Sequence, residues 1–472
     1  MRASWMATCL GATLLAGCSL DPDPARLTAP VPVAWPTGAA YAAASGAVAT
    51  LPADQIAWQE VILDPALRRL VELALVNNRD LRIATLNVSV AEAQYRAQRG
   101  ELFPSLNLTG DGNYAHSPVS PGLPVKPTTR SFSAGAGFTA YELDLFGRAR
   151  SMSRSAFQSY LGEVETQRAA LITLVAEVSN AYLAMVASRD LLDLAERTLR
   201  SQEESLRLTQ ATVAGGTATA LVVQQARSAV ETARASKAEN TRLLAQNENA
   251  LAQLIGQPVP PEAAMAASLD TVRIAEVPAG VSSDILLRRP DIMAAERQLR
   301  AAEADIGAAR AAFFPSITLT GFHGSSAGAL NGLFRSGTET WSFSPQITLP
   351  IFTAGINRAN LDAAKLRSDI RVATYEQSIQ AAFREVADAL AARGTYGEQI
   401  TAQRALADTA AESYRLAQLR FRAGVDSFLE SLVSQRDLFS AQQALIRLRQ
   451  DELASRITLY KTLGGGWAGS GE

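Results

Sequence analysis

The stretch GELFPSLNLTG, residues 100–110, returns later in the chain as AAFFPSITLTG, residues 311–321. Phe-Pro-Ser and Leu-Thr-Gly hold the same places in both copies, at a constant offset of 211 residues. In each copy an alanine-rich segment of helical character precedes the proline, and residues with a period of two follow it. The chain therefore contains the same helix-to-strand transition twice, which indicates an internal duplication.

Further matches extend this duplication over most of the chain. The segment EVSNAYL (177–183) corresponds to EVADALA (385–391), and RLTQATVAGG (207–216) corresponds to RLAQLRFRAG (415–424). Each copy of about 180 residues reads as a helix, two strands, a long helix, a turn and a further helix. We place the parts of the chain at 1–17 (signal peptide), 18–60 (extended tether), 61–260 (first repeat), 261–283 (linker), 284–467 (second repeat) and 468–472 (tail).

Two stretches without proline predict helices of unusual length. Proline breaks helix interiors, and the chain has none over residues 128–257 or after residue 350. We expect one long helix at about 148–211 and another at about 356–422. Apolar residues in both step by four, three and four, which is the spacing of a coiled-coil seam. They are Leu171, Val175, Val178 and Tyr182 in the first helix, and Ile379, Phe383, Val386 and Leu390 in the second.

The window 169–188 within the first of these helices is also apolar enough to suggest a transmembrane helix. Glu177 and Asn180 interrupt this window, and the coiled-coil spacing accounts for its apolar residues. We therefore reject the transmembrane interpretation.

Four runs of about ten residues alternate between polar and apolar side chains, as expected for β-strands with two different faces. They lie at about 104–115, 130–145, 315–324 and 340–351. In the second run Phe132, Ala134, Ala136, Phe138 and Ala140 share the apolar face. Such strands suit a membrane barrel with a wet interior. A soluble sheet packed on a core is the alternative, but nothing else in the sequence supplies that core, and we favour the barrel.

The first residues predict export and lipidation. Arg2 precedes the apolar run WMATCLGATLLAG (5–17), which is too short to span a bilayer and is typical of a signal peptide. LAGC (15–18) resembles the lipobox of bacterial lipoproteins, in which the cysteine, here Cys18, receives a diacylglycerol and an N-acyl chain. Ser19 stands where an aspartate would retain such a protein at the inner membrane, so the outer membrane is expected. The alternative is an ordinary cleavage site beside a chance cysteine.

The segment after the leader, up to residue 60, is rich in proline, alanine and threonine. It cannot pack a core of its own, and we interpret it as an extended tether. A disordered segment is the alternative for its first half.

Four strands per chain cannot close a barrel, and open strand edges are not tolerated in hydrocarbon. Several copies of the chain must therefore pool their strands. Three copies would give twelve strands, although the sequence does not itself specify that number.

These motifs resemble those of the TolC-like outer-membrane efflux factors, and more narrowly their NodT-type lipoprotein branch. The resemblance covers about residues 55–467 and rests on the lipobox, the duplicated unit and the two strand starts. It also rests on LRRPDI (287–292), RFRAGVDSFLESL (420–432) and LYKTLGGGW (459–467). It implies a mainly α-helical fold with a membrane β-barrel: a homotrimer with a twelve-stranded barrel in outer-membrane lipid and a long α-helical barrel across the periplasm.

The resemblance implies the function of an exit duct in a tripartite efflux pump. Its partners would be a resistance-nodulation-division transporter in the inner membrane and a periplasmic adaptor protein. The residues expected to line the lumen are Asn107, Thr109, Asp111, Ser342 and Thr348. Relatives close the periplasmic end with salt bridges, hydrogen bonds and often carboxylate rings. The helix turns of that end are expected at Gly215, Gly216 and Gly424.

The sequence departs from the family pattern at this expected gate. Val222 and Val433 stand where relatives commonly carry acids, and Phe421 stands in place of the usual tyrosine. A constriction built this way is expected to exclude ions by dewetting more than by charge. The charged residues that remain nearby are Asp426, Glu430 and the retained Arg436. The alternative is that these three are ordinary solvated residues near helix ends.

The sequence gives no support for an enzyme, a metal site or a nucleic-acid partner. The formal net charge of −2 does not favour a polyanion. His116 and His323 are expected at the far ends of strands near outer loops, and they show no metal-ligand spacing and no catalytic triad. VAGGTATA (213–220) follows a helix rather than a strand, which argues against a phosphate loop. The lipid on Cys18 is the only non-protein group expected.

Two other functions compete with efflux. One is a duct for type I secretion of polypeptides, driven by an ABC transporter; the lipobox and the GGGW tail (464–467) favour small-molecule efflux over it. The other is a structural coiled-coil lipoprotein that spans the periplasm, but such a spacer has no use for four amphipathic strands. The exported compounds cannot be read from this chain, because the inner-membrane transporter selects most of them.

Overall fold

The computed structural model describes residues 20–23, 30–41, 56–116, 128–215, 219–261, 268–277 and 282–465. The predicted signal peptide, Cys18 and Gly216 lie outside these residues. The chain forms two compact units. Unit 1 is built from Met1–Thr28, Asn87–Glu163 and Ala294–Tyr375, and unit 2 from Ala29–Leu86, Val164–Met293 and Glu376–Glu472.

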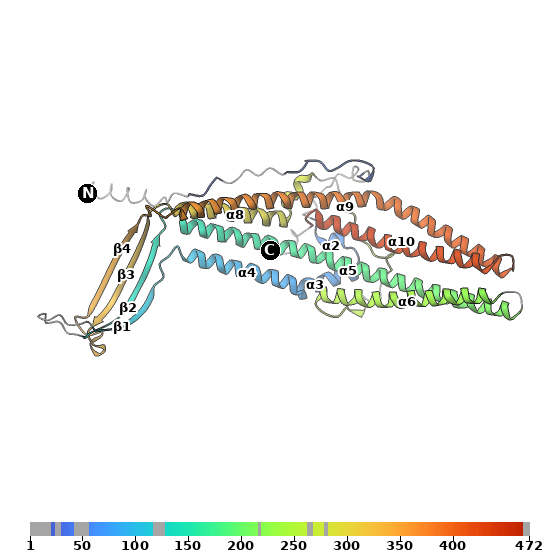
Figure 1. Cartoon of the computed structure of the whole chain (residues 1–472), viewed down its shortest axis with the longest axis horizontal. Helices are drawn as coiled ribbons and strands as arrows, with labels where there is room; N and C mark the ends of the chain where they lie inside the picture. The colour runs from blue at the N-terminus through green and yellow to red at the C-terminus, as the bar shows by residue number, and fades with distance from the viewer. Residues whose placement is uncertain are drawn as a thin grey trace. The chain divides into compact units, whose positions relative to one another are not determined.

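Unit 1 contains the four predicted strands, which form one antiparallel sheet in the order β1-β2-β3-β4 (Figure 1). A short 3-10 helix, η4, lies in the connection between the last two strands. The two middle strands are neighbours although 172 residues, 144–315, separate them in the sequence. Each half of the duplicated chain thus contributes one hairpin to a single sheet. The bounds are β1 (Asn107–His116), β2 (Thr128–Leu143), β3 (Ser316–Ala327), η4 (Leu330–Gly332) and β4 (Glu339–Thr348).

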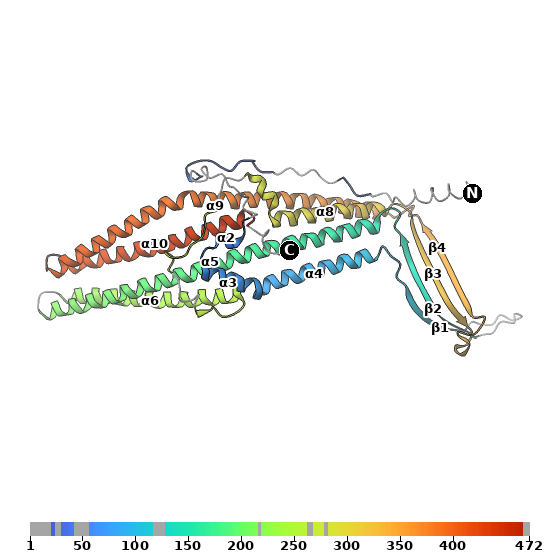
Figure 2. The same ribbon diagram turned by 180° about the vertical axis from the view of Figure 1, so that it is seen from behind.

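Helices frame each hairpin in the order that the repeat predicts. In the first copy they are α4 (Arg79–Gly100), α5 (Arg148–Ala214) and α6 (Ala220–Ile255), and in the second α8 (Pro290–Ala311), α9 (Ile356–Arg422) and α10 (Phe428–Thr462). Helices α5 and α9 have 67 residues each, so both long helices are confirmed. Helix α5 ends three residues later than expected. In both views α5 lies beside α6, and α9 lies beside α10 (Figures 1 and 2).

The core of unit 2 includes the predicted coiled-coil seams and two short helices, α2 (Trp58–Val61) and α3 (Pro65–Asn77). Asp64 caps α3 by accepting a hydrogen bond from the backbone N–H of Leu67 at 2.8 Å. Burial of the apolar seam removes it from water and is the main stabilising term. The buried seam residues are Val175, Val178, Tyr182, Ile379, Val386 and Leu390, while Leu171 and Phe383 are half-buried.

The two copies differ just before their first framing helix. The first copy has α3, whereas the corresponding place in the second holds the 3-10 helix η3 (Ser283–Arg288). Arg289 follows η3 and is buried, with its guanidinium 2.7 Å from the Asp291 carboxylate and 3.0 Å from that of Glu385. It also donates to the Thr462 carbonyl at 2.7 Å. LRRPDI and LYKTLGGGW, two of the motifs that carry the resemblance, are thereby joined by one side chain.

One window of α5 is long and apolar enough to cross a membrane by length and composition, and 56% of it is buried inside the protein. This burial agrees with its place in the coiled-coil seam. The packing therefore supports the prediction that these residues serve helix contacts.

Candidate functional site

The sheet of unit 1 has one polar face, and all five predicted lumen residues lie on it. Residues paired across antiparallel strands point to the same face. The pairing leads from Asp111 to Ser133 and from there to Ser326, and in the same way from Thr109 through Gly135 and Gly324 to Thr340. Ser342 and Thr348 follow on β4 at even spacing. The members of this polar face on the edge strands are Asn107, Thr109, Asp111, Asn113, Thr340, Ser342, Ser344, Gln346 and Thr348.

The opposite face of the sheet is exposed and mainly apolar, apart from Arg130, His323, Ser325 and Glu339 toward the hairpin turns. Leu108 is 86% exposed, Trp341 72% and Ile347 69%. An apolar surface of this extent is unfavourable in water and marks a contact with a partner or a membrane. With a polar face behind it, the sheet has the two-sided chemistry of a membrane barrel wall.

Phe322 departs from this pattern, because its pairing with Gly137 and Ser342 places it on the polar face. Its ring lies where a side chain on Gly135 would be, 2.8 Å from the position of a Cβ at that residue. Gly135 also approaches Gly324 across the sheet, with a Cβ at Gly135 falling 2.6 Å from the Gly324 Cα. Both positions therefore require glycine.

A β-bulge interrupts β2, and the sequence did not reveal it. The pairing changes register between Phe138, which lies opposite Gly321, and Tyr141, which lies opposite Leu319. Ala140 has a φ of 53°, a conformation that residues with a Cβ adopt rarely, and its N–H donates to the Thr320 hydroxyl at 3.1 Å. The extra residue turns Tyr141 to the face of Phe138. The predicted alternation through Ala140 is therefore wrong beyond Phe138.

His323 is also placed differently from the prediction. His116 ends β1 as expected, but His323 lies four residues before the end of β3, opposite Trp341. Its Nε2 is 3.1 Å from Oε1 of Glu339. Across the parts of the chain that the structure describes, no group of His, Cys, Asp and Glu has the arrangement of a metal site.

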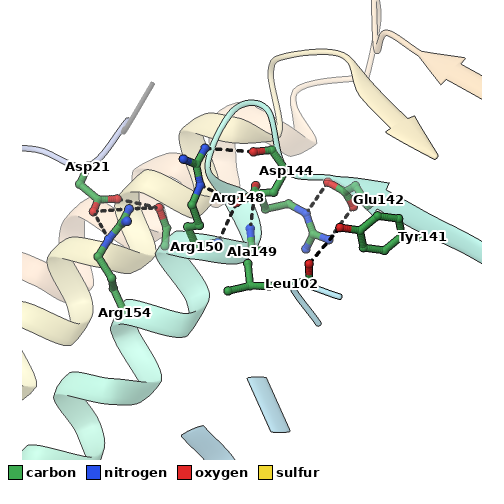
Figure 3. A network of polar contacts seen from close by, with 10 residues as sticks. Asp21, Leu102, Tyr141, Glu142, Asp144, Arg148, Ala149, Arg150 and Arg154 are labelled. Carbon is green, nitrogen blue, oxygen red and sulfur yellow. Dashed lines mark hydrogen bonds and ion pairs between the residues drawn. The ribbon is translucent and has the colours of Figure 1, made fainter. Parts of the chain in front are cut away.

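Polar contacts build the transition from β2 to α5, and sequence analysis missed their role (Figure 3). Asp144 accepts hydrogen bonds from the backbone N–H groups of Ala149 at 3.1 Å and Arg150 at 2.9 Å, which satisfies the first turn of the helix. Arg148 donates to both oxygens of Glu142, at 3.0 and 2.6 Å. The hydrogen bonds that Arg148 donates to the Glu142 carboxylate are the largest cause of the raised pKa of Arg148. All of these residues except Glu142 lie in the segment LDLFGRAR (143–150), which shows no periodic pattern that would have pointed to their role.

The turn between α9 and α10 in unit 2 holds two of the predicted gate residues. Gly424 has a φ of +72°, and the N–H of Val425 donates to the Arg420 carbonyl at 2.9 Å, so the chain reverses tightly. The Arg420 guanidinium donates to Oδ1 of Asp426 at 2.9 Å and lowers the pKa of that carboxyl. The Phe421 ring meets Phe428 edge to face, with 5.5 Å between centroids. Asp426 is thus engaged within its own turn.

A groove of about 360 Å³ lies in unit 2, and one of the two remaining apolar gate candidates, Val433, lines it. Val433 and Arg436 of α10 line it together with residues of α5 and α6, but Val222 does not. Gln202 of α5 also lines the groove and is buried, and its Oε1 has no hydrogen-bond partner among the described residues. Glu430, which also belongs to α10, is exposed and does not line the groove. In the described part of the chain, neither Glu430 nor Arg436 forms an ion pair.

In the turn between α5 and α6, the structure describes the chain up to Gly215 and again from Thr219. Gly215 follows α5, and its N–H donates to the Ala211 carbonyl at 3.0 Å. Helix α6 begins at Ala220, and the Val222 N–H donates to the Thr219 carbonyl at 3.1 Å. Val222 therefore lies in the first turn of α6.

Comparisons with known proteins agree with this architecture. The sequence pattern of the family described as "Outer membrane efflux protein" matches residues 70–257 and 281–465. The chain is 48% identical over 468 residues to the probable efflux pump outer membrane protein TtgC of Pseudomonas putida KT2440, covering 99% of this chain and 96% of that protein. It is 44% identical over 462 residues to the outer membrane protein OprJ of Pseudomonas aeruginosa PAO1, covering 97% and 94%. The open state of the MtrE outer membrane channel of Neisseria gonorrhoeae superimposes with a TM-score of 0.86 at 37% identity, covering 95% of this chain and 98% of that one.

Proposed function

Because this chain belongs to the outer membrane efflux protein family, we propose that three copies of it form the exit duct of a tripartite efflux pump. The chain is an outer-membrane efflux protein, and it acts in transport rather than in catalysis. A single chain does not contain the number of copies, the route of solutes through them or the partners on the periplasmic side, and these are the parts that we infer.

The two-faced sheet with open edges is the observation that carries the proposal. Strands β1 and β4 each pair on one side only among the described residues. Each unpaired backbone group costs several kcal/mol in hydrocarbon, so the edges must pair with other copies. Joining β1 of one copy to β4 of the next closes the wall, and three copies give twelve strands, within the range of known membrane barrels. The apolar face then meets lipid and the polar face lines the lumen.

Solutes would pass along the polar face by diffusion through water. Hydroxyl and amide groups such as those of Asn107, Thr109 and Ser342 offer weak hydrogen bonds that release a solute as readily as they take it. Asp111 adds one carboxylate per copy to the wall, which favours cations over anions. Apart from this preference for cations, the wall supports conduction with little discrimination.

Closure of the duct is proposed at the helix turns of unit 2. Phe421 and Val433 supply apolar surface there, and Val222 adds more from the first turn of α6. Asp426 is held by Arg420, so its charge is partly neutralised within the turn. These features support closure mainly by dewetting, because Asp426 is paired and only Glu430 among the acidic gate candidates forms no ion pair in the described chain.

Partners and lipid complete the proposal. Relatives are named as components of efflux pumps, which supports an inner-membrane resistance-nodulation-division transporter and a periplasmic adaptor over an ABC-driven polypeptide secretion system. We also propose that Cys18 carries the diacylglycerol and N-acyl chains. Mass spectrometry of the mature chain tests the lipid, since acylation adds a defined mass to residue 18.

Neighbouring residues on opposite faces allow a direct test of the duct. The sequence has only two cysteines, Cys9 and Cys18, so the processed and acylated protein would contain no free thiol. Thr109→Cys should react with a charged, membrane-impermeant thiol reagent and lower the conductance of channels in planar bilayers. Leu108→Cys, on the lipid side, is the matched control and should leave conductance unchanged. Equal effects at both positions would reject the assignment of the two faces.

Partner capture tests the pump assignment separately. In-cell cross-linking and mild detergent purification should recover a trimer with a resistance-nodulation-division transporter and its adaptor. Recovery of an ABC transporter instead would move the protein to secretion, and a trimer with neither would revive the structural alternative.

A further inference from the structure

The beginning of the predicted tether is seated on unit 1. The Asp21 carboxylate accepts hydrogen bonds from the Ser151 hydroxyl and from Nε of Arg154, each at 2.7 Å (Figure 3). Arg310, near the end of α8, donates to the carbonyl oxygen of Leu20 at 2.8 Å. Helices from both copies of the repeat therefore hold two consecutive residues of the N-terminal segment.

The groups that form the seat contact one another as well as Asp21. Ser151 is 0% exposed, and Arg154 donates to its Oγ at 3.0 Å as well as to Asp21. Gly307 of α8 provides the space, because a Cβ at that position would overlap Oδ1 of Asp21 and lie 2.8 Å from the Ser151 hydroxyl. The Ser151 hydroxyl, the Arg154 guanidinium and the space at Gly307 thus match the charge and shape of the Asp21 carboxylate.

A second part of the tether is bound on unit 2. The Trp35 ring stacks on Phe383 with 5.0 Å between centroids, and the Ser283 hydroxyl donates to the Val33 carbonyl at 2.9 Å. Gly394 of α9 leaves room for the chain at Ala40, where a Cβ would overlap the Ala40 carbonyl. The described stretches of the tether are therefore bound to the protein, which the prediction of an extended tether without a core of its own did not anticipate.

We propose that Ser151, Arg154, Gly307 and Arg310 form a binding site for the mature N-terminus of the chain itself, which holds the acylated residue beside unit 1. Asp21 is three residues after Cys18, and three residues span at most about 10 Å. The acyl chains are then confined to the place where α5 follows β2 and α8 precedes β3. The position of the lipid rests on the lipidation proposed above, whereas the Asp21 site does not.

A protease provides the test, because the sequence contains one suitable bond. Arg26 is the only lysine or arginine between residues 3 and 67. Asp21 lies five residues before this bond, and trypsin binds an extended stretch on both sides of the bond it cuts, so release of Asp21 from its site should make cleavage after Arg26 faster. The rate of this cleavage in the purified, full-length protein reports how often the seat opens. Mass spectrometry follows the new N-terminus at Leu27.

Three single variants should accelerate the cleavage. Asp21→Asn and Arg154→Gln each remove charge-assisted hydrogen bonds, and an increase of roughly tenfold or more is expected. The double variant should be cut no faster than the faster single variant, because both act on one contact.

Gly307→Ala fills the seat without changing any charge, and alanine is the better helix former, so α8 itself should not lose stability. It should accelerate cleavage while thermal unfolding of the protein stays at or above that of the parent.

Matched controls separate the seat from general effects. Arg168→Gln removes an arginine of the same helix that pairs with Glu165 at 2.8 Å, and Gly397→Ala adds a methyl group where nothing lies within 4 Å. Both should be cut at the parent rate. Parent rates for Arg154→Gln and Gly307→Ala would overturn the proposed site, as would equal acceleration by the two controls.

The same digest distinguishes this inference from the proposed lipidation. The released fragment 18–26 carries the acyl mass when Cys18 is lipidated. An unmodified fragment with variant-dependent cleavage would refute the lipid and retain the seat. An acylated fragment with cleavage independent of the variants would refute the seat and retain the lipid.

Discussion

At the scale of single residues, the glycines of the sheet decide how closely β2 and β3 can approach. Gly135 and Gly324 face each other, and a Cβ on Gly324 would overlap the Ala134 carbonyl and lie 2.6 Å from the Gly135 Cα. The obstacle is backbone, which cannot rotate away as a flexible side chain can. These two residues therefore set the spacing of the strands that join the two halves of the chain.

Gly324→Ala should destabilise the sheet by about 1–3 kcal/mol, the usual cost of overpacking a close contact. The melting temperature of the detergent-resistant oligomer, followed on gels, measures this change. Gly110→Ala in β1 is the control, because its nearest obstacle would be 4.0 Å away. Equal losses for both variants would show that strand propensity, not the close approach, is responsible.

At the scale of elements, α5 depends on a carboxylate that lies outside it. Asp144 accepts from the N–H groups of the first turn, where a helix has no partners of its own. Asp144→Ala should lower stability by about 0.5–2 kcal/mol, as for the loss of a helix cap. Thermal unfolding by circular dichroism checks this. Asp388→Ala, which removes a 75% exposed carboxylate within α9, should change the melting temperature much less.

The α9–α10 turn gives a prediction about pH. The Arg420 hydrogen bond depresses the pKa of Asp426 in the folded state, so the stabilisation is present above the pKa of the unfolded state. It is lost as the pH falls through the folded pKa, below the ordinary aspartate value of about 3.9. Basal leak through the closed channel should therefore be constant from neutral to mildly acidic pH. It should rise only in stronger acid, as measured in planar bilayers.

Asp426→Asn removes the charge from this turn at every pH. Its leak should be higher than that of the parent at neutral pH and should no longer change in strong acid through this group. Glu430→Gln is the matched comparison, since Glu430 has no ion pair within the described chain. A parent-like leak in Asp426→Asn would show that the turn does not contribute to closure.

Sequence patterns revealed the elements whose signal is periodic. The duplication, both 67-residue helices and all four strands followed from repeated phrases, missing prolines and spacing. The bulge at Ala140 and the position of Phe322 on the polar face could not be predicted, because both depend on contacts with a strand far away in the sequence. The pairing of Asp426 with Arg420 could not be predicted for a similar reason: the tight turn at Gly424 brings the two side chains together.

At the scale of the whole molecule, the two faces of the sheet should tolerate opposite substitutions. Phe343 and Ser344 are neighbours in β4 and point to the apolar and the polar face. Phe343→Arg should weaken membrane insertion by about 2–4 kcal/mol, the cost of a cation facing lipid near the bilayer midplane. Ser344→Arg should insert normally. Fractionation of outer membranes and oligomer yield measure the difference, and equal yields would argue against a lipid-facing side.

The pairing of β2 with β3 also has a consequence for the time course of biosynthesis. The hairpins β1–β2 and β3–β4 each close over 11 residues, but β2 and β3 are 172 residues apart. At about 5–20 residues per second, translation delivers β3 roughly 9–35 s after β2. Loop-closure entropy makes that pairing costlier than either hairpin by about 2.4 kcal/mol. The first hairpin thus exists for seconds with an unsatisfied apolar face and an unpaired edge, which makes it the stage of synthesis most in need of a periplasmic chaperone.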